Sequence, residues 1–343
     1  NGFQDNGTGL YENGSWFTVL GGDGMDCVID PKDPKYGYSD LYYGDVRRYT
    51  NGRSSGRIAA NGKNGITESG AWVTPFVLKE GTPSTMFIGY KNVWRSTNIQ
   101  NTSSASVTWT KISNNLGSSN TKNIVFLENS PASTGTLYMS RSDSKMFKTS
   151  NIGATSPTWT DLTSKLPNNS NVNWIESHST MKDRLWIIQS NKVYRSDDGG
   201  DNWSNWSTGL PGIPLLSIVY DSSSKNEGMY LGTYMGVYYR DTTMSDWIWY
   251  NVGMPINTRV RDVEIFYDQS GRDKSHVICA TYGRGNWRSP LYDEEQLAPI
   301  ADFSIDENKI CANQTVKLSD LSLRNPTRWN WTISPGGAKY MSG

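Results

Sequence analysis

The segment Tyr230-Leu-Gly-Thr-Tyr-Met-Gly-Val-Tyr-Tyr-Arg240 holds two short runs of β-forming residues around a Tyr-Met-Gly turn, and it ends on a basic residue. Five other segments follow the same pattern, and their final basic residues are Arg48, Arg95, Lys148, Arg195 and Arg288. Counting Arg240, neighbouring end points lie 45 to 53 residues apart. An apolar run precedes most of these segments, and a strand-like stretch with Trp follows most of them. Four strands in each repeat, with no helical period between them, predict the blade of a β-propeller.

The N-terminal residues contain part of an additional blade. Ser15–Val19 has the pattern of an outer strand, and Phe3–Gly7 has the pattern of the turn between two middle strands. The sequence therefore predicts an all-β propeller of about seven four-stranded blades over residues 1–290. Two arrangements stay open: the last blade borrows its outer strand from residues 15–19, or the N-terminus is truncated and upstream blades are missing.

Composition excludes several classes of function. The 33 basic residues balance the 33 acidic ones, which argues against nucleic acid as a partner. No stretch of 18 apolar residues is present, so no membrane-spanning helix is expected. The three cysteines are far apart and His is scarce, which excludes a zinc site by spacing, and no metal or cofactor is expected. Cys27 and Cys279 are expected to be small buried side chains, although ring closure could bring them together as a disulfide.

One repeat carries a longer motif, Ser196-Asp-Asp-Gly-Gly-Asp-Asn-Trp203. It resembles the Asp-box, or BNR repeat, found in sialidases, sortilin-type receptors and the oligoxyloglucan-hydrolase group. Asp198 can accept backbone N–H groups, Gly200 permits a positive φ, and Trp203 can pack between sheets. The motif lies between a third and a fourth strand, away from the usual ligand face. We therefore expect Ser196, Asp198, Gly200 and Trp203 to be structural.

After Pro290 the pattern changes. Residues 291–299 are polar and are predicted to be a linker, and residues 300–343 alternate with period two. The segment Pro326-Thr-Arg-Trp-Asn-Trp-Thr-Ile333 resembles a strand of a PKD domain, which implies the N-terminal half of an immunoglobulin-like β-sandwich. Phrases such as Gly21-Gly-Asp-Gly-Met25 resemble secreted Bacteroidetes propellers. The resemblance implies a bacterial protein that is extracellular or on the outer cell surface. It also implies type IX secretion machinery as a partner, through a sorting domain outside this chain.

The repeat alignment locates a ligand face, because a propeller binds ligands at the turns between second and third strands and at the loops between blades. Tyr residues recur in these turns, where a flat apolar ring with a polar tip suits sugars or extended peptides. The predicted ligand-binding residues are Tyr43, Tyr90, Tyr234, Tyr282, Arg284 and Asp5. The basic residue that ends each repeat is instead predicted to hydrogen-bond a neighbouring blade.

Signatures of catalysis are few. The motifs H-E-x-x-H and G-x-S-x-G, the P-loop and the sialidase Arg-Ile-Pro motif are absent. Asp23, Asp26, Asp45 and Glu68 could still supply the carboxylate pair that glycoside hydrolysis requires. We therefore favour a binding or adhesion propeller that engages a glycan or an extracellular protein over an enzyme, and any enzymatic activity is expected to be that of a glycosidase. The alternatives are a glycoside hydrolase of the oligoxyloglucan-hydrolase type and a sortilin-like peptide-binding receptor.

Overall fold

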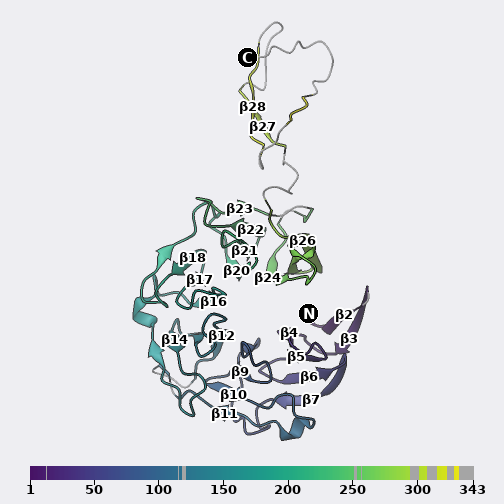
Figure 1. The fold of residues 1–343 in the computed structure, drawn as a ribbon, viewed down its shortest axis with the longest axis vertical. Helices are drawn as coiled ribbons and strands as arrows, with labels where there is room; N and C mark the ends of the chain where they lie inside the picture. The colour runs from purple at the N-terminus through teal and green to yellow at the C-terminus, as the bar shows by residue number, and fades with distance from the viewer. Residues whose placement is uncertain are drawn as a thin grey trace. The chain divides into compact units, whose positions relative to one another are not determined.

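The computed structural model describes residues 1–12, 14–114, 116–117, 121–250, 253–255, 257–293, 301–306, 315–322 and 328–331. The chain divides into two compact units, Asn1–Pro290 and Leu291–Gly343. In the first unit, seven antiparallel sheets are arranged as blades around one axis, and Figure 1 shows the strands β4, β12, β16, β20 and β24 on the inner side of the ring. The prediction of an all-β propeller is confirmed.

Blade 1 consists of β1 (Gly2–Phe3), β2 (Gly7–Glu12) and β3 (Ser15–Leu20), and blade 2 of β4 (Cys27–Ile29), β5 (Tyr36–Asp40), β6 (Val46–Thr50) and β7 (Arg53–Ala59). Blade 3 consists of β8 (Phe76–Leu78), β9 (Met86–Gly89), β10 (Val93–Ser96) and β11 (Thr110–Lys111), and blade 4 of β12 (Ile124–Asn129), β13 (Leu137–Arg141), β14 (Met146–Thr149) and β15 (Thr160–Asp161). Blade 5 consists of β16 (Val172–Ser177), β17 (Leu185–Gln189), β18 (Lys192–Ser196) and β19 (Ser204–Asn205), and blade 6 of β20 (Leu215–Tyr220), β21 (Met229–Thr233), β22 (Gly236–Arg240) and β23 (Ile248–Trp249). Blade 7 consists of β24 (Val260–Phe266), β25 (His276–Thr281) and β26 (Asn286–Pro290).

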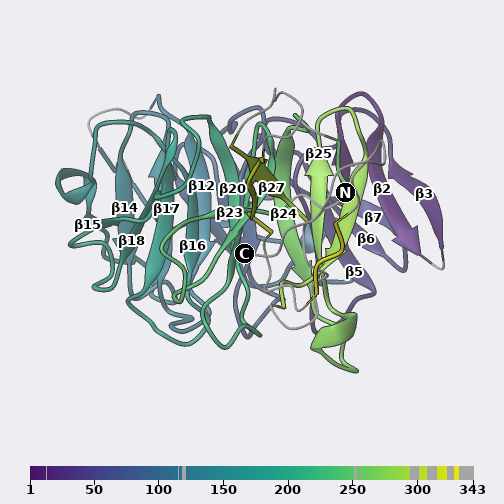
Figure 2. The ribbon, with the colours of Figure 1, turned by 90° about the horizontal axis from the view of Figure 1, so that it is seen from above.

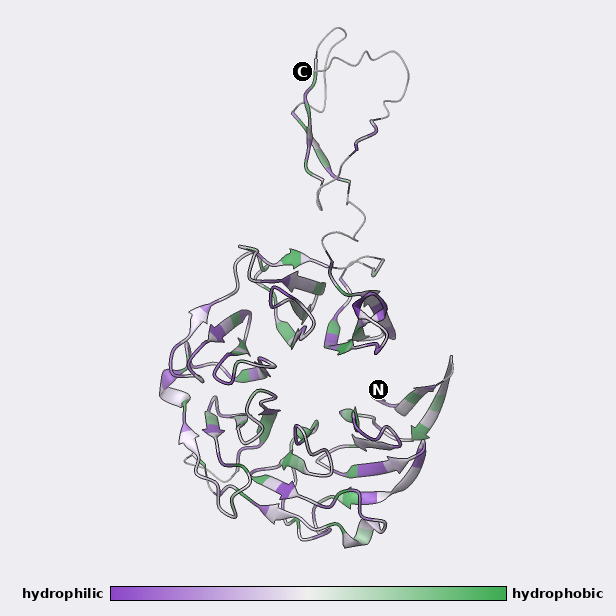
Figure 3. Cartoon of the chain, viewed as in Figure 1, coloured by the Kyte–Doolittle hydropathy of each residue, from purple (hydrophilic) through white to green (hydrophobic). Residues whose placement is uncertain are grey.

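Helical structure in the described residues is limited to three single 3₁₀ turns, η1 (Ser104–Ser106), η2 (Thr163–Lys165) and η3 (Arg272–Lys274). None of these is long or apolar enough to cross a membrane. Seen from the side, strands of successive blades stand next to one another around the ring (Figure 2). Figure 3 shows apolar residues on the strands around the ring, as expected when each sheet packs its faces against its neighbours.

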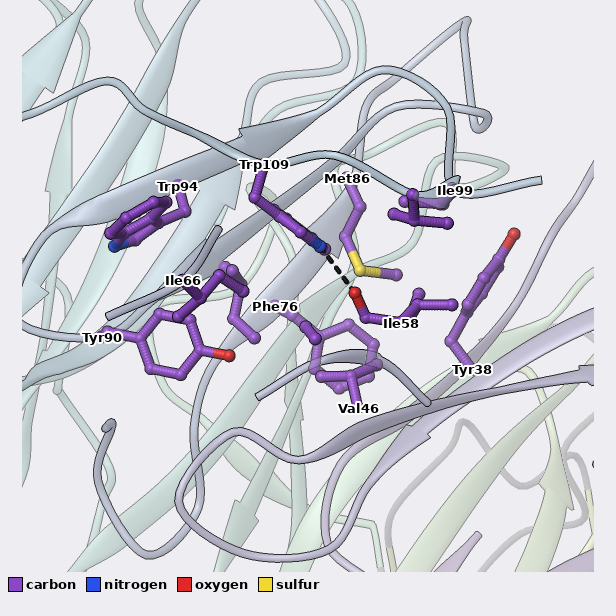
Figure 4. Close-up of a cluster of buried hydrophobic side chains, with 13 residues drawn as sticks. Tyr38, Val46, Ile58, Ile66, Phe76, Met86, Tyr90, Trp94, Ile99 and Trp109 are labelled. Carbon is purple, nitrogen blue, oxygen red and sulfur yellow. Dashed lines mark hydrogen bonds between the residues drawn. The ribbon is translucent and has the colours of Figure 1, made fainter. Parts of the chain in front are cut away.

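The contacts between blades 2 and 3 and between blades 3 and 4 join buried apolar side chains with hydrogen bonds. Between blades 2 and 3, the Trp109 indole nitrogen donates to the Ile58 carbonyl oxygen at 2.7 Å inside a fully packed cluster (Figure 4). Trp159 makes the equivalent bond from blade 4 to Ile112 of blade 3, at 3.0 Å. The expected outer strands begin immediately after these tryptophans, so the Trp itself serves as the bridge to the preceding blade.

Basic residues bridge in the opposite direction. The Arg48 guanidinium of blade 2 donates to the Ile99 carbonyl oxygen of blade 3 at 2.8 Å, and Arg95 of blade 3 donates to Ala154 of blade 4 at 3.0 Å. The prediction that the repeated basic residue bonds a neighbouring blade is confirmed for these two positions and for Arg240, whose guanidinium donates to the Trp206 carbonyl oxygen of the preceding blade at 3.1 Å. In blade 5 it fails, because the Arg195 guanidinium pairs with Asp197 of its own blade.

The first and last blades each have three strands in the described residues. The turn predicted at Phe3–Gly7 lies between β1 and β2, and β3 pairs with β2 in the same sheet. Residues 15–19 therefore do not supply the outer strand of blade 7. Cys27 and Cys279 are both free thiols, and Cys279 is buried as expected.

In the second unit, β27 (Phe303–Ile305) pairs with β28 (Leu318–Asp320) in antiparallel fashion. The Phe303 ring meets the Trp331 ring edge-on, with centroids 5.5 Å apart. The assignment of residues 300–343 to a PKD domain stays a prediction, and Cys311 lies outside the described residues.

Candidate ligand-binding face

The turns that contain the predicted ligand residues all lie at one end of the propeller. Because strands within a blade are antiparallel, the turn between the second and third strands lies at the same end as the connection from the fourth strand to the next blade. We call this end the open face. The corresponding turns of blades 4 and 5 present Ser, Asn, Asp and Lys, so the aromatic residues of the open face are unevenly distributed.

Three exposed aromatic rings meet on the open face between blades 2 and 3, and we call them the Trp72 cluster. Tyr42 and Trp72 are stacked, with centroids 5.5 Å apart and planes 12° from parallel, and the Tyr43 ring meets Trp72 edge-on at 5.4 Å. Their exposed fractions are 42% for Tyr42, 50% for Tyr43 and 43% for Trp72. An apolar surface that is this exposed and this ordered marks an interaction site more often than chance.

The backbone holds the Trp72 cluster in place. The Tyr43 N–H donates to the Trp72 carbonyl oxygen at 3.3 Å, and the Gly70 N–H donates to the Tyr43 carbonyl oxygen at 3.2 Å. Tyr43 has φ of 60° and Gly44 has φ of 81°, so the turn uses two consecutive left-handed residues. Both loops are therefore fixed relative to each other before any ligand arrives.

Tyr90 supports this turn from below and is not on the surface. Its side chain is fully buried, and its hydroxyl donates to the Gly44 carbonyl oxygen at 2.7 Å. A Cβ atom on Gly44 would lie 2.2 Å from the Tyr90 ring, which explains the glycine. The expectation that Tyr90 contacts ligand is wrong, because its position in the repeat places it against the neighbouring turn and away from solvent.

A second aromatic group lies between blades 6 and 7, and we call it the Arg259 cluster. The Arg259 guanidinium lies 4.2 Å from the Tyr234 ring centroid and 5.5 Å from that of Tyr282. The Tyr282 N–H donates to the Arg259 carbonyl oxygen at 2.9 Å, which fixes the turn to the inter-blade loop. Tyr234, Tyr282 and Arg284 are exposed, as predicted for ligand-binding residues.

The predicted acidic residues are not brought together as a free pair. The Asp45 carboxylate pairs with Arg47 at 2.8 Å and Arg57 at 2.7 Å. The Asp23 carboxylate accepts the Asp5 N–H at 2.8 Å, so these two predicted residues share one loop contact.

Glu68 is likewise committed to the fold. Its carboxylate accepts the Asn92 N–H at 3.0 Å, the Asn92 side-chain amide at 2.8 Å and the Trp94 indole N–H at 3.2 Å. A carboxylate that three donors hold in place is a structural acceptor for the β9–β10 turn. This arrangement argues against Glu68 as a catalytic acid or base.

Different carboxyl groups gather near the axis. The Asp40 side chain is fully buried and accepts the Asp26 N–H at 2.8 Å and the Thr74 N–H at 3.3 Å. Burial, and then the nearby Asp26 carboxylate, raises the pKa of Asp40 to about 8. Dense surrounding protein, and then the Asp262 carboxylate, raises the pKa of Asp26 to about 7, although the residue is exposed to solvent. These groups hold protons near neutral pH, where ordinary carboxylic acids do not.

Inner strands carry further carboxylates along the axis. Glu128 and Glu176 occupy equivalent positions of β12 and β16, opposite Tyr138 and Trp186. The Glu176 carboxylate accepts the Tyr220 N–H of the next blade at 2.8 Å, and burial raises its pKa well above the usual range. These residues therefore link blades, and no group of three or more His, Cys, Asp or Glu among the described residues is placed to hold a metal ion.

The turn at Ser196–Trp203 has the structural role predicted for it. The Asp198 carboxylate accepts the Asn202 N–H at 2.9 Å and the Asn202 side-chain amide at 2.7 Å, and it accepts the Ser196 hydroxyl at 2.8 Å. Hydrogen bonding from Asn202 lowers the pKa of Asp198. The Gly200 φ of 101° agrees with the expected positive value.

The longer turn of blade 3, between β10 and β11, repeats this geometry without an acid. Ser96 donates to the Asn98 side-chain oxygen at 3.0 Å, and the same oxygen accepts the Thr108 N–H at 3.0 Å. Asn therefore replaces Asp at this position while the turn is kept.

Sequence reasoning missed Tyr42, Trp72, Arg259 and Asp40. Tyr42 directly precedes Tyr43, and Trp72 lies two residues beyond the loop Glu68–Gly70 that was assigned to the open face. Arg259 lies in the connection between blades 6 and 7. Applying the inter-blade rule to every such connection, and extending each by a few residues, would have found Trp72 and Arg259. Nothing in the sequence marks Asp40 as buried.

The chain was compared with family models, curated proteins and solved structures. No protein-family model matches the sequence, and no curated protein matches it. Among solved structures, the chain is similar to the GH74 xyloglucanase from Xanthomonas campestris, with a TM-score of 0.49 and 13% sequence identity. The match covers 82% of this chain and 47% of the xyloglucanase chain, so this chain spans about half the length of that enzyme.

Proposed function

We propose that this propeller is a glycan-binding protein whose ligand stacks on the Trp72 cluster. The observation that carries the proposal is the exposed, ordered set of Tyr42, Tyr43 and Trp72 on the open face. Sugar rings present C–H faces that pack on aromatic side chains, and tyrosine hydroxyls add polar contacts. The location outside the cell, the PKD spacer and the type IX secretion partner stay predictions from the sequence.

The preformed backbone of the site supports this role. Tyr43 and Trp72 are joined by a main-chain hydrogen bond, and Tyr90 fixes the turn from below. Because these loops are already ordered, binding a sugar costs little conformational entropy. A surface that served only to cover the core would not need to hold two stacked rings in solvent.

Replacing Trp72 tests the proposal. We expect Trp72→Ala to weaken binding to the glycans that the native protein retains on a glycan array by about 10-fold or more, because the largest stacking ring is lost. Trp249→Ala is the matched control, since Trp249 is exposed to a similar degree but lies on the outer strand β23. Retention of native affinity by Trp72→Ala would place the ligand elsewhere, and failure of the native protein to bind any glycan would refute the proposal.

A second candidate function is glycoside hydrolysis, and the acids near the axis favour it. Asp26 and Asp40 have raised pKa values of about 7 and about 8 and lie beside each other. Asp26 is exposed and could exchange a proton with a glycosidic bond, whereas Asp40 is fully buried and could act only through Asp26. Release of reducing sugar from a polysaccharide by the native protein, abolished by Asp26→Asn, would support it. If the native protein binds but releases no sugar, binding alone is the function.

A further inference from the structure

We propose that the Arg259 cluster is a subsite for a carboxylate group, so that the glycan bound on the open face is acidic and contains uronic-acid residues. This inference rests on the proposed function and specifies its ligand. It draws on the geometry of Arg259, Tyr234 and Tyr282, which is independent of the Trp72 cluster.

The charge of Arg259 has no protein partner. Its side chain forms no hydrogen bond and no ion pair with any residue in the described part of the chain, and its Nε atom is buried without an acceptor. Other arginines near the open-face turns are neutralised, as Arg47 and Arg57 are by Asp45. An arginine that is positioned but not paired is uncommon in a folded protein, because buried donors normally find acceptors.

The rings leave the hydrogen-bonding edge of the guanidinium available. Tyr234 and Tyr282 contact it through their π faces, at 4.2 Å and 5.5 Å from the ring centroids. A cation–π contact uses none of the guanidinium N–H donors, and because Nε is buried, the two Nη groups are the donors that a carboxylate would meet. The rings therefore orient the Arg259 guanidinium but supply no acceptor for its N–H groups.

Neighbouring residues favour an anionic sugar. Tyr282 is 67% exposed, so its ring can stack on a sugar while Arg259 binds the carboxylate of that sugar. Arg284 lies two residues beyond Tyr282 and is exposed. Two cations with no acidic partner in the described residues attract a polyanion and repel a cationic ligand.

Matched polymers test the inference. The probes are polygalacturonate, alginate and glucuronoxylan, each compared with its carboxyl-reduced form at a salt concentration of about 150 mM, where surface charges more than about 8 Å apart are screened. We expect the native protein to prefer at least one acidic polymer over its reduced form by about 10- to 100-fold, as for loss of a charge-assisted bidentate contact. Dextran sulfate is the control for a general attraction to polyanions, and equal binding to it would overturn the inference.

Variants assign the preference to Arg259. Arg259→Gln should remove the preference, so that the acidic polymer and its reduced form bind with equal affinity, and Arg259→Lys should keep only part of the preference because Lys lacks the fork. Arg53→Gln, in the outer strand of blade 2 next to a turn at the opposite end, is the control for loss of one positive charge. A full preference in Arg259→Gln would overturn the inference.

The outcome separates this inference from the proposed function. Binding of a glycan that depends on Trp72 but shows no carboxylate preference overturns the inference alone. Absence of binding to every polymer overturns both.

Discussion

Two turns at opposite ends of the blades show different uses of polar and aromatic residues. In the Ser196–Trp203 turn, the Asp198 carboxylate accepts hydrogen bonds from Ser196 and Asn202, so the polar groups of the turn find their partners within the turn. In the Tyr43 turn, the polar backbone is satisfied from below by Tyr90 while the aromatic ring faces solvent. The segment with the strongest motif is thus closed to ligands, and the segment without a motif presents the surface that a ligand can use.

The largest effect is expected from the glycine that permits the Tyr43 turn. Gly44→Ala should lower the free energy of unfolding by about 2–4 kcal/mol, because the new methyl group meets the Tyr90 ring and the φ is positive. Displacement of the turn should also weaken glycan binding. Chemical denaturation and a binding assay measure the two effects.

Gly62→Ala is the matched control for Gly44→Ala. Gly62 also has a positive φ, of 76°, but no atom lies within 4 Å of its ideal Cβ position. Only the backbone preference is lost there, so about 1 kcal/mol is expected. Equal destabilisation by the two substitutions would show that contact with Tyr90 does not determine the turn.

A smaller effect is expected on the opposite face. Asp198→Ala should cost about 1–2 kcal/mol, because an exposed turn loses a charged acceptor that holds Asn202 and Ser196. Binding at the open face should not change. Asp201→Ala, in the same loop but at a side chain with no hydrogen bond or ion pair among the described residues, should change the unfolding free energy by less than about 0.5 kcal/mol. Loss of glycan binding without loss of stability in Asp198→Ala would reverse the comparison of the two turns.

The smallest effect is on the pH dependence of stability, where the two faces should act in opposite directions. The raised pKa values of Asp26 and Asp40 mean that the folded state holds their protons more tightly than the unfolded state. Their contribution to the free energy of unfolding is full below about pH 4 and is lost as the pH rises through about 7 to 8. The lowered pKa of Asp198 has the opposite sign, and its contribution is lost only as the pH falls below about 4.

Urea unfolding between pH 5 and pH 8 measures this slope. The native protein should become less stable as the pH rises, and Asp26→Asn should show a shallower decline because one titrating group is gone. The amide keeps an oxygen that can accept the Cys27 N–H, which the native carboxylate accepts at 2.8 Å. Identical slopes for the two proteins would contradict the assignment of a raised pKa to Asp26.

The repeat predicted the fold because it constrains many residues at once. Each blade needs four strands and a bridge to its neighbour, so residues such as Arg48 and Trp109 recur at intervals that the sequence displays directly. The number of strands in blades 1 and 7 could not be derived in this way. It depends on whether β3 pairs with β2 or with β26, and both pairings suit the same alternation of residues.

The repeat alignment predicted at which end of the propeller each turn lies, but it did not predict whether the Tyr side chain in that turn is buried. Tyr43, Tyr90, Tyr234 and Tyr282 are equivalent in sequence, yet Tyr90 is buried because the Gly44 turn of blade 2 covers it. The raised pKa of Asp40 arises from its burial by neighbouring segments, which outweighs the lowering effect of the Asp26 and Thr74 N–H groups that its carboxylate accepts. Such effects arise from contacts between blades, which a repeat alignment treats as identical and which differ at every junction.

The paired bridges between blades also limit how a gene for such a protein can lengthen or shorten. Arg48 and Arg95 donate hydrogen bonds to the next blade along the chain. Trp109 and Trp159 donate hydrogen bonds to the preceding blade. Duplicating or deleting a stretch of coding sequence preserves both kinds of bond only when it spans one whole repeat, whatever residue it starts from. Any other length would leave an arginine or an indole facing a carbonyl group that is no longer there. Selection should therefore favour changes in ring size by single-blade steps.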